Sequence, residues 1–268
     1  PARAGEHSSV GLLDQILCVL ARADVRPGGP VEPVEVVSEP SGVERAFHWV
    51  TASGGRWVDP SIGLFSARRA PATMVVAMAD RCWESTDAAY NRYHDEEWGR
   101  PVVDERGLYE KLCLEGFQSG LSWLTILRKR EAFRAGFAGF DPEQVATFGD
   151  QDVARLLADA GIVRHRGKIE AAIANAHAVL ELRAAGRPLP ELVWAYRVDG
   201  PAPRSSRDWK ATTPGSEALS KELRKAGFRF VGPTTVYSTM QACGVVNDHL
   251  ATCPARAATE RARQAVSL

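Results

Sequence analysis

Apolar residues recur at helical spacing over most of the chain beyond residue 80. The clearest case begins at Ile169, from which apolar side chains follow at steps of three or four residues and end at Leu180, all on one helix face. Shorter stretches of the same kind predict helices over 108–113, 121–133, 153–160, 217–225 and 235–243. Alternating strand patterns are rare there, and no long internal repeat is visible. The pattern therefore predicts an all-α domain.

The first 77 residues read differently. They contain no Lys, they are rich in Pro, Gly, Val and Ala, and only 12–23 has a helical pattern, while 44–58 could form a hairpin. The chain begins with Pro1, and Met74 and Met78 are candidate native starts. Three interpretations remain: an irregular extension of unknown role, a fusion remnant, or sequence upstream of the true start. We expect an extension over 1–77, a domain over 78–256 and a C-terminal tail over 257–268.

Charge and cysteine content narrow the possible functions. Lys and Arg total 33, and so do Asp and Glu, so any affinity for nucleic acid must come from a local patch. No apolar run approaches the roughly 20 residues that a membrane span needs. The five cysteines are odd in number, and no signal-peptide pattern precedes them, so a disulfide framework is not expected. A reducing cytoplasm is the expected location.

A short cationic loop joins two of the predicted helices. It carries two glycines and four cationic or titratable side chains: Gly161, Arg164, His165, Arg166, Gly167 and Lys168. The free N–H groups and the dipole of a helix that begins here favour a phosphate. One interpretation is a helix-hairpin-helix that binds the DNA backbone by shape and charge. The other is an ordinary pair of helices with a solvated loop, which the loop taken alone favours.

Two Cys/His pairs stand at opposite ends of the predicted domain. His249 and Cys253 are four residues apart, a spacing that lets two side chains of one helix share a metal ion, and Cys82 and His94 are twelve apart. Together they would form a closed tetrahedral site. The pairs are remote and no Cys-x-x-Cys is present, so the pattern alone favours ordinary core packing.

Aromatic residues crowd two segments, one of which contains a carboxylate. The aromatic residues are Trp83, Tyr90, Tyr93, Trp98 and Trp123. Glu115 stands near Gly116 and Gly120. Aromatic faces stack on bases, and a carboxylate can bond base amines or balance a cationic base. The alternative is that the aromatic residues form core and that Glu115 caps a helix.

Four longer stretches contain most of these residues, in order: 93–99, 114–123, 160–169 and 230–249. Together, from Arg81 to about Cys253, they resemble the bacterial 3-methyladenine DNA glycosylase I family. The resemblance implies an all-α helix-hairpin-helix DNA glycosylase fold with a structural zinc site. It also implies an enzyme that flips 3-methyladenine out of alkylated double-stranded DNA and hydrolyses its N-glycosidic bond, the first step of base excision repair.

The resemblance also implies roles for individual residues. One Zn²⁺ per chain would be bound by Cys82, His94, His249 and Cys253. The damaged base would sit between Tyr93 and Trp123, and it would be contacted by Glu115. The remaining pocket residues would be Trp83, Tyr90 and Trp98. DNA would be contacted by Gly120 and Leu121 beside the flipped nucleotide and by Gly161, Arg164, His165, Arg166, Gly167 and Lys168. In one departure, Trp83 follows Cys82 directly, where the family often has one more residue.

The expected chemistry needs little acid catalysis, because a base alkylated at N3 is cationic and leaves as a neutral molecule. Many helix-hairpin-helix glycosylases carry a catalytic Asp some twenty residues beyond the hairpin, and here no Asp occurs from 160 to 198. We therefore expect a monofunctional enzyme that uses water, acting as a monomer near the nucleoid. Rival interpretations are a non-catalytic zinc-pinned DNA-binding protein, an inactive enzyme and a hydrolase for other alkylated bases. Excision of 3-methylguanine stays open.

Overall fold

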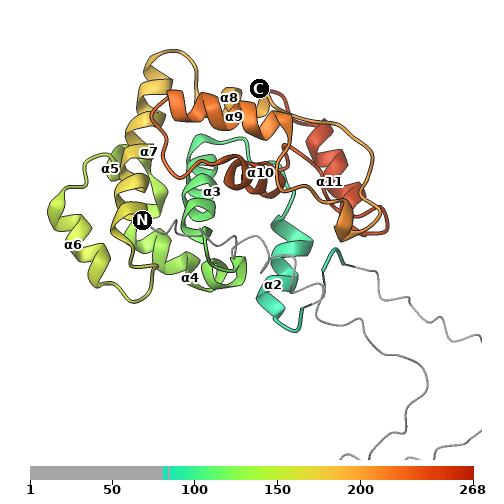
Figure 1. The fold of residues 1–268 in the computed structure, drawn as a ribbon, viewed down its shortest axis with the longest axis horizontal. Coiled ribbons are helices and arrows are strands. Elements are labelled where there is room, and N and C mark those ends of the chain that lie inside the picture. The colour runs from blue at the N-terminus through green and yellow to red at the C-terminus, as the bar shows by residue number, and fades with distance from the viewer. Residues whose placement is uncertain (1–80, 84) are drawn as a thin grey trace, which may run out of the picture. The chain divides into compact units, whose positions relative to one another are not determined.

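The computed structural model describes residues 81–268 except residue 84, and all regular structure in that part is helical (Figure 1). The helices are α2 (Ala88–Arg92), α3 (Glu105–Gln118), α4 (Trp123–Gly136), α5 (Pro142–Val145), α6 (Asp150–Ala158), α7 (Arg166–Ala184), α8 (Leu189–Trp194), α9 (Pro214–Lys225), α10 (Pro233–Ala242) and α11 (Ala255–Gln264). A π-helical turn, η1 (Tyr93–Glu97), follows α2, and two 3₁₀ turns are η2 (Ala138–Phe140) and η3 (Ser206–Asp208). The predicted all-α class is confirmed. The helix expected over 12–23, the hairpin expected over 44–58 and the extension lie outside the described residues.

The six helices predicted beyond residue 80 are present. They correspond to α3, α4, α6, α7, α9 and α10. Local chemistry sets several starts: the side chains of Asp104, Ser122 and Thr213 accept backbone N–H bonds at the first turns of α3, α4 and α9. None of the helices in the described part is long and apolar enough to cross a lipid bilayer.

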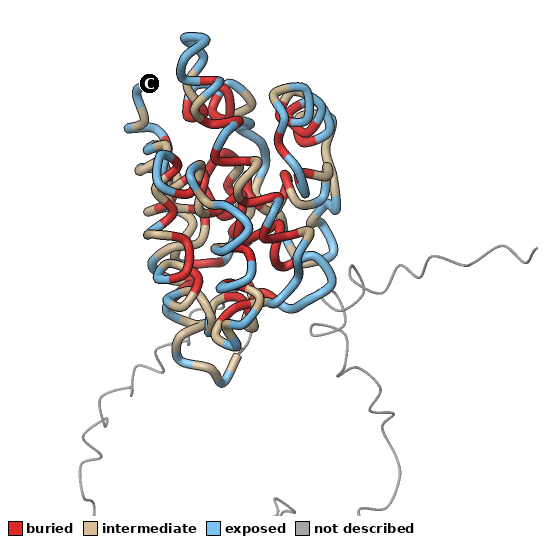
Figure 2. Tube along the Cα trace, turned by 90° about the vertical axis from the view of Figure 1, so that its left-hand side faces the viewer, coloured by how far each residue is buried: buried red, intermediate tan, exposed pale blue. Residues whose placement is uncertain are grey.

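Helix α3 runs through the middle of the helical part, in contact with α4, α7, α8 and α10 (Figure 1). Every residue from Lys111 to Gln118 is buried, because neighbours cover the helix on all sides. Figure 2 shows the same arrangement as buried segments through the interior and exposed segments outside. A polar residue on this helix, such as Glu115, is therefore removed from water by the fold.

The two remote parts of the chain that carry the Cys/His pairs meet where Gly99 and Gly244 cross. Both glycines have positive φ angles, +79° and +75°. A Cβ atom on Gly244 would lie 2.5 Å from the Gly99 carbonyl oxygen, so no larger residue allows this approach. The Val102 N–H donates to the Cys243 carbonyl at 3.1 Å. This crossing places the 82–98 segment beside the 243–253 segment.

The segment expected as a C-terminal tail, 257–268, lies largely within helix α11, which packs on the domain. Arg263 is only 1 % exposed. Its guanidinium donates to the carbonyls of Gly244, Val245 and Val198 and pairs with Asp199 and Glu260. A buried guanidinium needs this many acceptors to offset its desolvation. The expected boundary at residue 256 therefore falls inside a packed helix.

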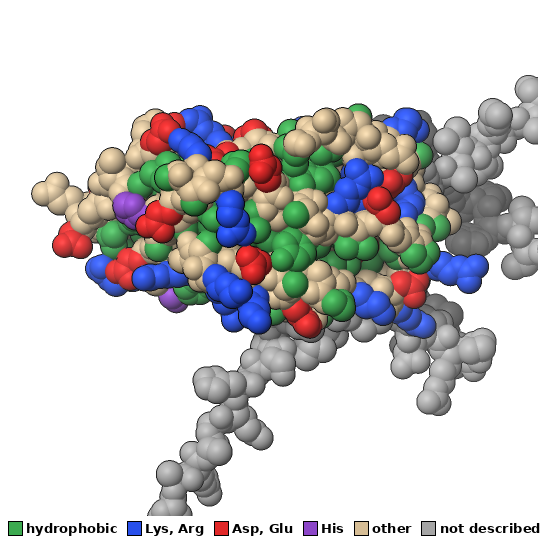
Figure 3. Space-filling view, turned by 90° about the horizontal axis from the view of Figure 1, so that it is seen from above, with side chains coloured by type: hydrophobic (Ala, Val, Ile, Leu, Met, Phe, Trp, Pro, Cys, Tyr) green, Lys and Arg blue, Asp and Glu red, His purple; other side chains and the backbone are tan. Residues whose placement is uncertain are grey.

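The surface of the described part carries both signs of charge. On the face seen in Figure 3, Lys and Arg side chains alternate with Asp and Glu, with apolar side chains between them. The described part also carries exposed ion pairs, such as Arg166 with Glu170 at 3.3 Å. This mixture of charges agrees with the balanced composition, so any affinity for DNA must come from a local group of cations and not from the whole surface.

Candidate active site and metal cluster

The aromatic residues singled out from the sequence form one continuous cluster. Tyr93 and Trp123 are 3 % and 7 % exposed, and their ring centroids lie 5.2 Å apart with planes tilted by 42°. Tyr90 stacks on Tyr93 at 6.4 Å, and Trp83 stacks on Tyr90 at 5.2 Å. Trp83 also contacts the edge of Trp98 at 5.0 Å. We call these five residues the aromatic cage. Trp83 remains within the cage even though it follows Cys82 directly.

Glu115 lies on the buried side of α3, next to the cage. Its residue is 6 % exposed, and burial raises the pKa of its carboxyl to about 8, while the charge of Lys111 acts in the opposite direction. Burial and the charge of Glu115 also raise the pKa of Tyr93. Among the described residues, burial and the charge of Lys111 act on the Glu115 carboxyl, and no hydrogen bond does. The carboxyl is therefore not the helix cap that the alternative interpretation required.

Two further polar groups of the cage lack partners. The indole Nε1 atoms of Trp83 and Trp123 are buried and make no hydrogen bond within the described part of the chain. Buried polar groups are normally satisfied in a folded protein, and each exception needs an explanation. The unpaired donors and the isolated carboxyl are consistent with a cage that completes its hydrogen bonding only when a polar, flat ligand enters.

Lys111 contacts the cage, and the sequence analysis missed it. Its ammonium lies 5.2 Å from the Tyr93 ring centroid and 5.9 Å from that of Trp123. It also lies 3.8 Å from Glu97, whose carboxylate forms a fork with Arg130. A cation over these two rings shows that their faces suit positive charge. The available signal was spacing, since Lys111 stands one helical turn before Glu115.

Trp209 is a second residue that the sequence analysis missed. Its ring centroid lies 6.5 Å from Trp83 and 6.1 Å from Trp98, and its indole N–H donates to the Asp248 carbonyl at 2.9 Å. It therefore joins the cage to the segment before His249. No sequence pattern around Trp209 indicated this position.

The four predicted metal ligands come together. The ligand atoms of Cys82, His94, His249 and Cys253 all lie within 4.8 Å of one another, and all four residues are buried. His249 Nδ1 lies 3.4 Å from Cys82 Sγ and 3.3 Å from Cys253 Sγ, and His94 Nε2 lies 3.6 Å from Cys253 Sγ. Around a tetrahedral zinc ion, sulfur and nitrogen ligands stand roughly 3.6 Å apart. The group, which we call the metal cluster, therefore fits such an ion.

The other nitrogen of each histidine ring in the metal cluster is also held. His94 Nδ1 bonds the Asp95 carboxylate at 2.8 Å, and Arg81 in turn binds that carboxylate through two nitrogens. His249 Nε2 bonds the Trp98 carbonyl at 2.9 Å. A carboxylate or carbonyl in this position fixes the ring and the tautomer of a metal-binding histidine.

The metal cluster and the aromatic cage share side-chain contacts. The His94 ring lies 4.6 Å from Trp83, and the His249 ring lies 4.6 Å from Trp98. Both histidines are fully buried. The cluster therefore supports one side of the cage through direct ring contacts, which the sequence spacing alone did not indicate.

The loop after α3 is a tight turn with an exposed apolar tip. Ser119 has φ −47° and ψ 114°, Gly120 has φ +82°, and the Leu121 N–H donates to the Gln118 carbonyl at 2.6 Å. These values define a type II turn, in which the third position requires a positive φ and so favours glycine. Leu121 is 38 % exposed. We call residues 118–121 the wedge turn.

The cationic loop connects α6 and α7 as predicted. The His165 side chain caps α7 by accepting the Lys168 N–H at 3.2 Å, while Arg164 and Arg166 are exposed. Lys129 donates to the Gly161 carbonyl, and a Cβ atom on Gly161 would lie 2.8 Å from Ala132. Figure 1 shows the loop at the ends of α6 and α7. Gly167 lies at the start of α7.

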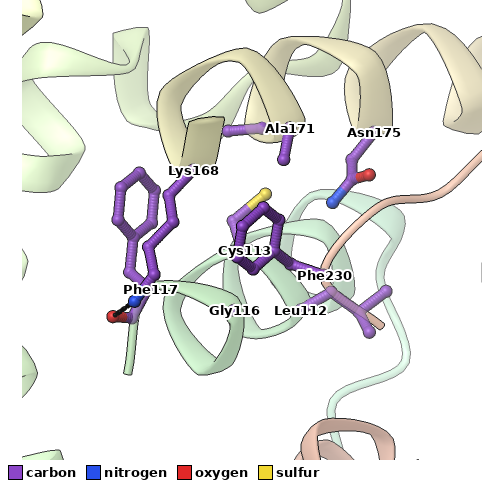
Figure 4. Close-up of a pocket in the computed structure, with 9 residues that line it drawn as sticks. Leu112, Cys113, Gly116, Phe117, Lys168, Ala171, Asn175 and Phe230 are labelled. Carbon is purple, nitrogen blue, oxygen red and sulfur yellow. Dashed lines mark hydrogen bonds between the residues drawn. The ribbon is translucent and has the colours of Figure 1, made fainter. Parts of the chain in front are cut away.

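Lys168, unlike Arg164 and Arg166, is buried and does not project from this loop. Its residue is 8 % exposed, and its ammonium donates to the Phe117 carbonyl at 2.8 Å (Figure 4). It also donates to the Ser119 carbonyl at 2.6 Å. The end of α3 carries unpaired carbonyls and partial negative charge, which an ammonium satisfies. Burial lowers the Lys168 pKa.

Comparisons with known proteins agree with this geometry. The family model described as methyladenine glycosylase matches residues 83–257. DNA-3-methyladenine glycosylase 1 of Escherichia coli K12 is 50% identical over 178 residues, which cover 65% of this chain and 95% of that protein.

Solved structures give the same result. A crystal structure of 3-methyladenine DNA glycosylase I has a TM-score of 0.63 and 49% identity, and the match covers 65% of this chain and 98% of the other. A variant of 3-methyladenine DNA glycosylase I in complex with 3-methyladenine has a TM-score of 0.62 and 37% identity, covering 64% and 94%.

Proposed function

The chain belongs to the methyladenine glycosylase family, and we propose that it is a monofunctional DNA N-glycosylase that excises 3-methyladenine from alkylated double-stranded DNA. The observation that carries the proposal is the position of Glu115, an isolated buried carboxyl beside the Tyr93–Trp123 pair. The carboxyl and the aromatic pair would both bind a flat cationic base, whereas a protein that only holds the DNA backbone needs neither of them.

The flipped base would enter between Tyr93 and Trp123. A ring stacked on both sides needs roughly 7 Å between the two aromatic planes, about twice the contact distance of carbon atoms. The two centroids lie 5.2 Å apart and the rings are tilted. The pair must therefore open by about 2 Å and become more nearly parallel when the base binds. Each face then contributes cation–π attraction of about 0.5–2 kcal/mol.

Glu115 would select the alkylated base by charge. Adenine alkylated at N3 is cationic in DNA, and unmodified adenine is neutral. Because burial raises the Glu115 pKa to about 8, its carboxyl holds a proton at neutral pH in the free protein. An adjacent cation favours the charged form of a carboxyl, so Glu115 releases its proton to solvent as the base enters. Unmodified adenine cannot offset the cost of forming a buried anion.

The bond between sugar and base then breaks with a neutral leaving group, and water adds to the sugar. A lyase would need a lysine that attacks the sugar carbon. Lys168, the lysine of the hairpin, donates instead to the Phe117 and Ser119 carbonyls. This supports hydrolysis without a covalent enzyme–DNA intermediate.

We further propose that the metal cluster holds one structural Zn²⁺. Four protein ligands, Cys82, His94, His249 and Cys253, complete a tetrahedral shell and leave no position for water. When bound, the ion would join two segments more than 150 residues apart in the chain. Its support for the cage would be mechanical, through the His94 and His249 rings.

DNA would be held by the α6–α7 loop and the wedge turn. We propose that α6, the loop and α7 form a helix-hairpin-helix in which the exposed Arg164 and Arg166 contact phosphates. The exposed Leu121 would enter the gap left by the flipped nucleotide. We propose a monomer that acts in the cytoplasm, since one chain supplies every one of these groups.

The direct test is release of free base. Purified protein is incubated with methylated duplex DNA, and the released bases are separated by chromatography, with undamaged duplex as the control. The proposal predicts 3-methyladenine in the soluble fraction and no adenine from the control. Binding of the methylated duplex without base release would favour the non-catalytic alternative. A separate 3-methylguanine peak would widen the substrate range.

A further inference from the structure

Lys168 connects two elements that the proposed function places against DNA. It stands in the first turn of α7, directly after the cationic loop, and its side chain reaches the end of α3 (Figure 4). The wedge turn begins at that end of α3, with Gly120 and Leu121 at its tip. One side chain therefore spans from the phosphate-binding loop to the turn beside the base.

The two bonds of Lys168 are made to alternate carbonyls of the turn. Backbone N–H groups already occupy the carbonyls of Gly116 and Gln118, which accept from Ser119 and Leu121. The carbonyls between and beyond them, of Phe117 and Ser119, accept from the Lys168 ammonium. The last turn of α3 has no basic residue of its own. A cation from another helix thus completes the hydrogen bonding of this helix end.

The bond to Ser119 has a conformational consequence. Types I and II turns differ mainly by rotation of the central peptide, whose carbonyl here belongs to Ser119. In the type II form, the Ser119 carbonyl points to the Lys168 ammonium at 2.6 Å. Rotation to type I would turn that carbonyl away and leave a buried ammonium with one acceptor fewer. Lys168 therefore favours the form in which Gly120 adopts φ +82°.

We propose that Lys168 is a positioning residue that fixes the wedge turn in its type II form and transmits the placement of the α6–α7 loop on the backbone to Leu121. It acts through the turn and does not contact phosphate itself. This inference rests on the proposed function, because it assigns the wedge turn to the flipped nucleotide.

The test compares Lys168→Met with two variants that also remove one positive charge. Lys225→Met removes an exposed lysine of α9 that pairs with Glu222, and it controls for net charge. Arg166→Met removes a cation of the loop itself. Three quantities are measured: single-turnover excision, the salt dependence of binding to undamaged duplex, and the fluorescence of 2-aminopurine next to a tetrahydrofuran abasic site.

Lys168→Met is expected to lower excision by roughly tenfold to a hundredfold, since a small misplacement near the reacting base has effects of this size. The fluorescence change on binding should be largely lost. Undamaged-duplex affinity and its salt slope should match those of Lys225→Met. Arg166→Met should show the opposite pattern, with a smaller salt slope and a fluorescence change that persists when binding is saturated.

Two results would overturn the proposal. A salt slope that falls as much in Lys168→Met as in Arg166→Met would make Lys168 a phosphate contact. Unchanged excision and fluorescence in folded Lys168→Met, with only a lower thermal midpoint, would leave it a purely structural residue. If the wild-type chain releases no base at all, the proposed function fails first, and the fluorescence arm still reports on the turn.

A second variant tests the same turn without touching Lys168. Gly120→Ala meets open space, so its cost comes from the positive φ alone. It should reproduce the loss of excision and of fluorescence change. The double variant Gly120→Ala, Lys168→Met should lose little more than either single variant, because both act through one turn. Fully additive losses would contradict a shared mechanism, and this comparison stays available if Lys168→Met folds poorly.

Discussion

The metal cluster and the aromatic cage are neighbours, but they differ in whether their polar groups have hydrogen-bond partners. In the cluster, each histidine ring has one nitrogen facing the thiols and the other bonded to Asp95 or to the Trp98 carbonyl. In the cage, the indole nitrogens of Trp83 and Trp123 have no hydrogen-bond partner among the described residues. Beside the cage, the buried Glu115 carboxyl is offset only by the charge of Lys111. Polar groups that are all hydrogen-bonded stabilise the fold, whereas buried groups without partners are suited to bind a ligand.

The contacts between the two regions make their relation unequal. Rings of the cluster support rings of the cage, as His94 does for Trp83. Loss of the cluster should therefore lower the stability of the fold that holds the cage, whereas loss of a cage group should leave the cluster intact. The variants below are chosen to break or to sharpen this contrast.

The largest effect should come from the cluster. Cys253→Ala removes a buried ligand, and we expect the free energy of unfolding to fall by roughly 4 kcal/mol or more, as is typical when a structural metal is lost. Elemental analysis of the wild-type chain should find one zinc per chain. The excision rate per folded molecule should change much less than stability does. Absence of any metal from the purified protein would count decisively against the cluster as a zinc site.

Glu115, beside the cage, should add its own contribution to the pH dependence of stability. The folded-state Glu115 pKa is raised from 4.5 to about 8 by burial. Between these values, the folded chain keeps a proton that the unfolded chain has lost, so this group lowers stability progressively as pH rises through that window. Glu115→Gln should remove this contribution, and its advantage over wild type in urea unfolding should grow from pH 5 to pH 8. Equal pH profiles would contradict the raised pKa.

Ionisation of Glu115 should also give the excision rate a pH dependence. Excision at subsaturating enzyme should rise with pH up to about 8, because less free energy is then needed to ionise Glu115 as the cationic base binds. Glu115→Gln should abolish this dependence. The pH profile of single-turnover rates at low enzyme concentration measures it, and a flat wild-type profile would be the contrary result.

The loop between α6 and α7 belongs to neither region and should affect binding alone. Arg166 is exposed. Arg166→Ala should weaken binding to damaged and undamaged duplex about equally and reduce the slope of log K against log salt by about 0.9, the value for one phosphate. An effect confined to damaged DNA, with an unchanged slope, would place Arg166 in the base site.

The smallest effect is expected for the first 77 residues. They match none of the family stretches, and every proposed site residue lies beyond them. A chain that starts at Met78 should release base at the wild-type rate and bind the same amount of zinc. A large loss of activity in soluble, folded 78–268 protein would show that the extension takes part.

Periodicity and motif order predicted most of the helices and the right family, but two features depended on distant partners. Lys168 follows two exposed arginines in the sequence, so it was assigned to phosphate. Its acceptors are about 50 residues away on α3. Likewise α11 carries no large apolar residue, and the burial of Arg263 is compensated by the carbonyls of Gly244 and Val198, which accept from it. Hydrogen bonds between a buried cation and carbonyls far away in the sequence cannot be predicted from local residue spacing.

The metal cluster illustrates the opposite case. Spacing alone favoured ordinary core packing for these four residues, and only the family resemblance favoured metal binding. The physical determinant is the crossing of Gly99 and Gly244, which allows the two pairs to meet. Lys111 was missed because its meaning depends on the rings of Tyr93 and Trp123 above it. A charge on a buried helix face becomes informative only when its neighbours are known.

The most direct test of the account is single-turnover excision of 3-methyladenine by Glu115→Gln, measured together with its thermal midpoint. The substitution keeps the size of the side chain and removes its charge. The account predicts a barrier higher by about 2–4 kcal/mol, with a midpoint at or above the wild-type value and a full complement of zinc. Wild-type excision with a lowered midpoint would contradict it, because Glu115 would then act only in the fold.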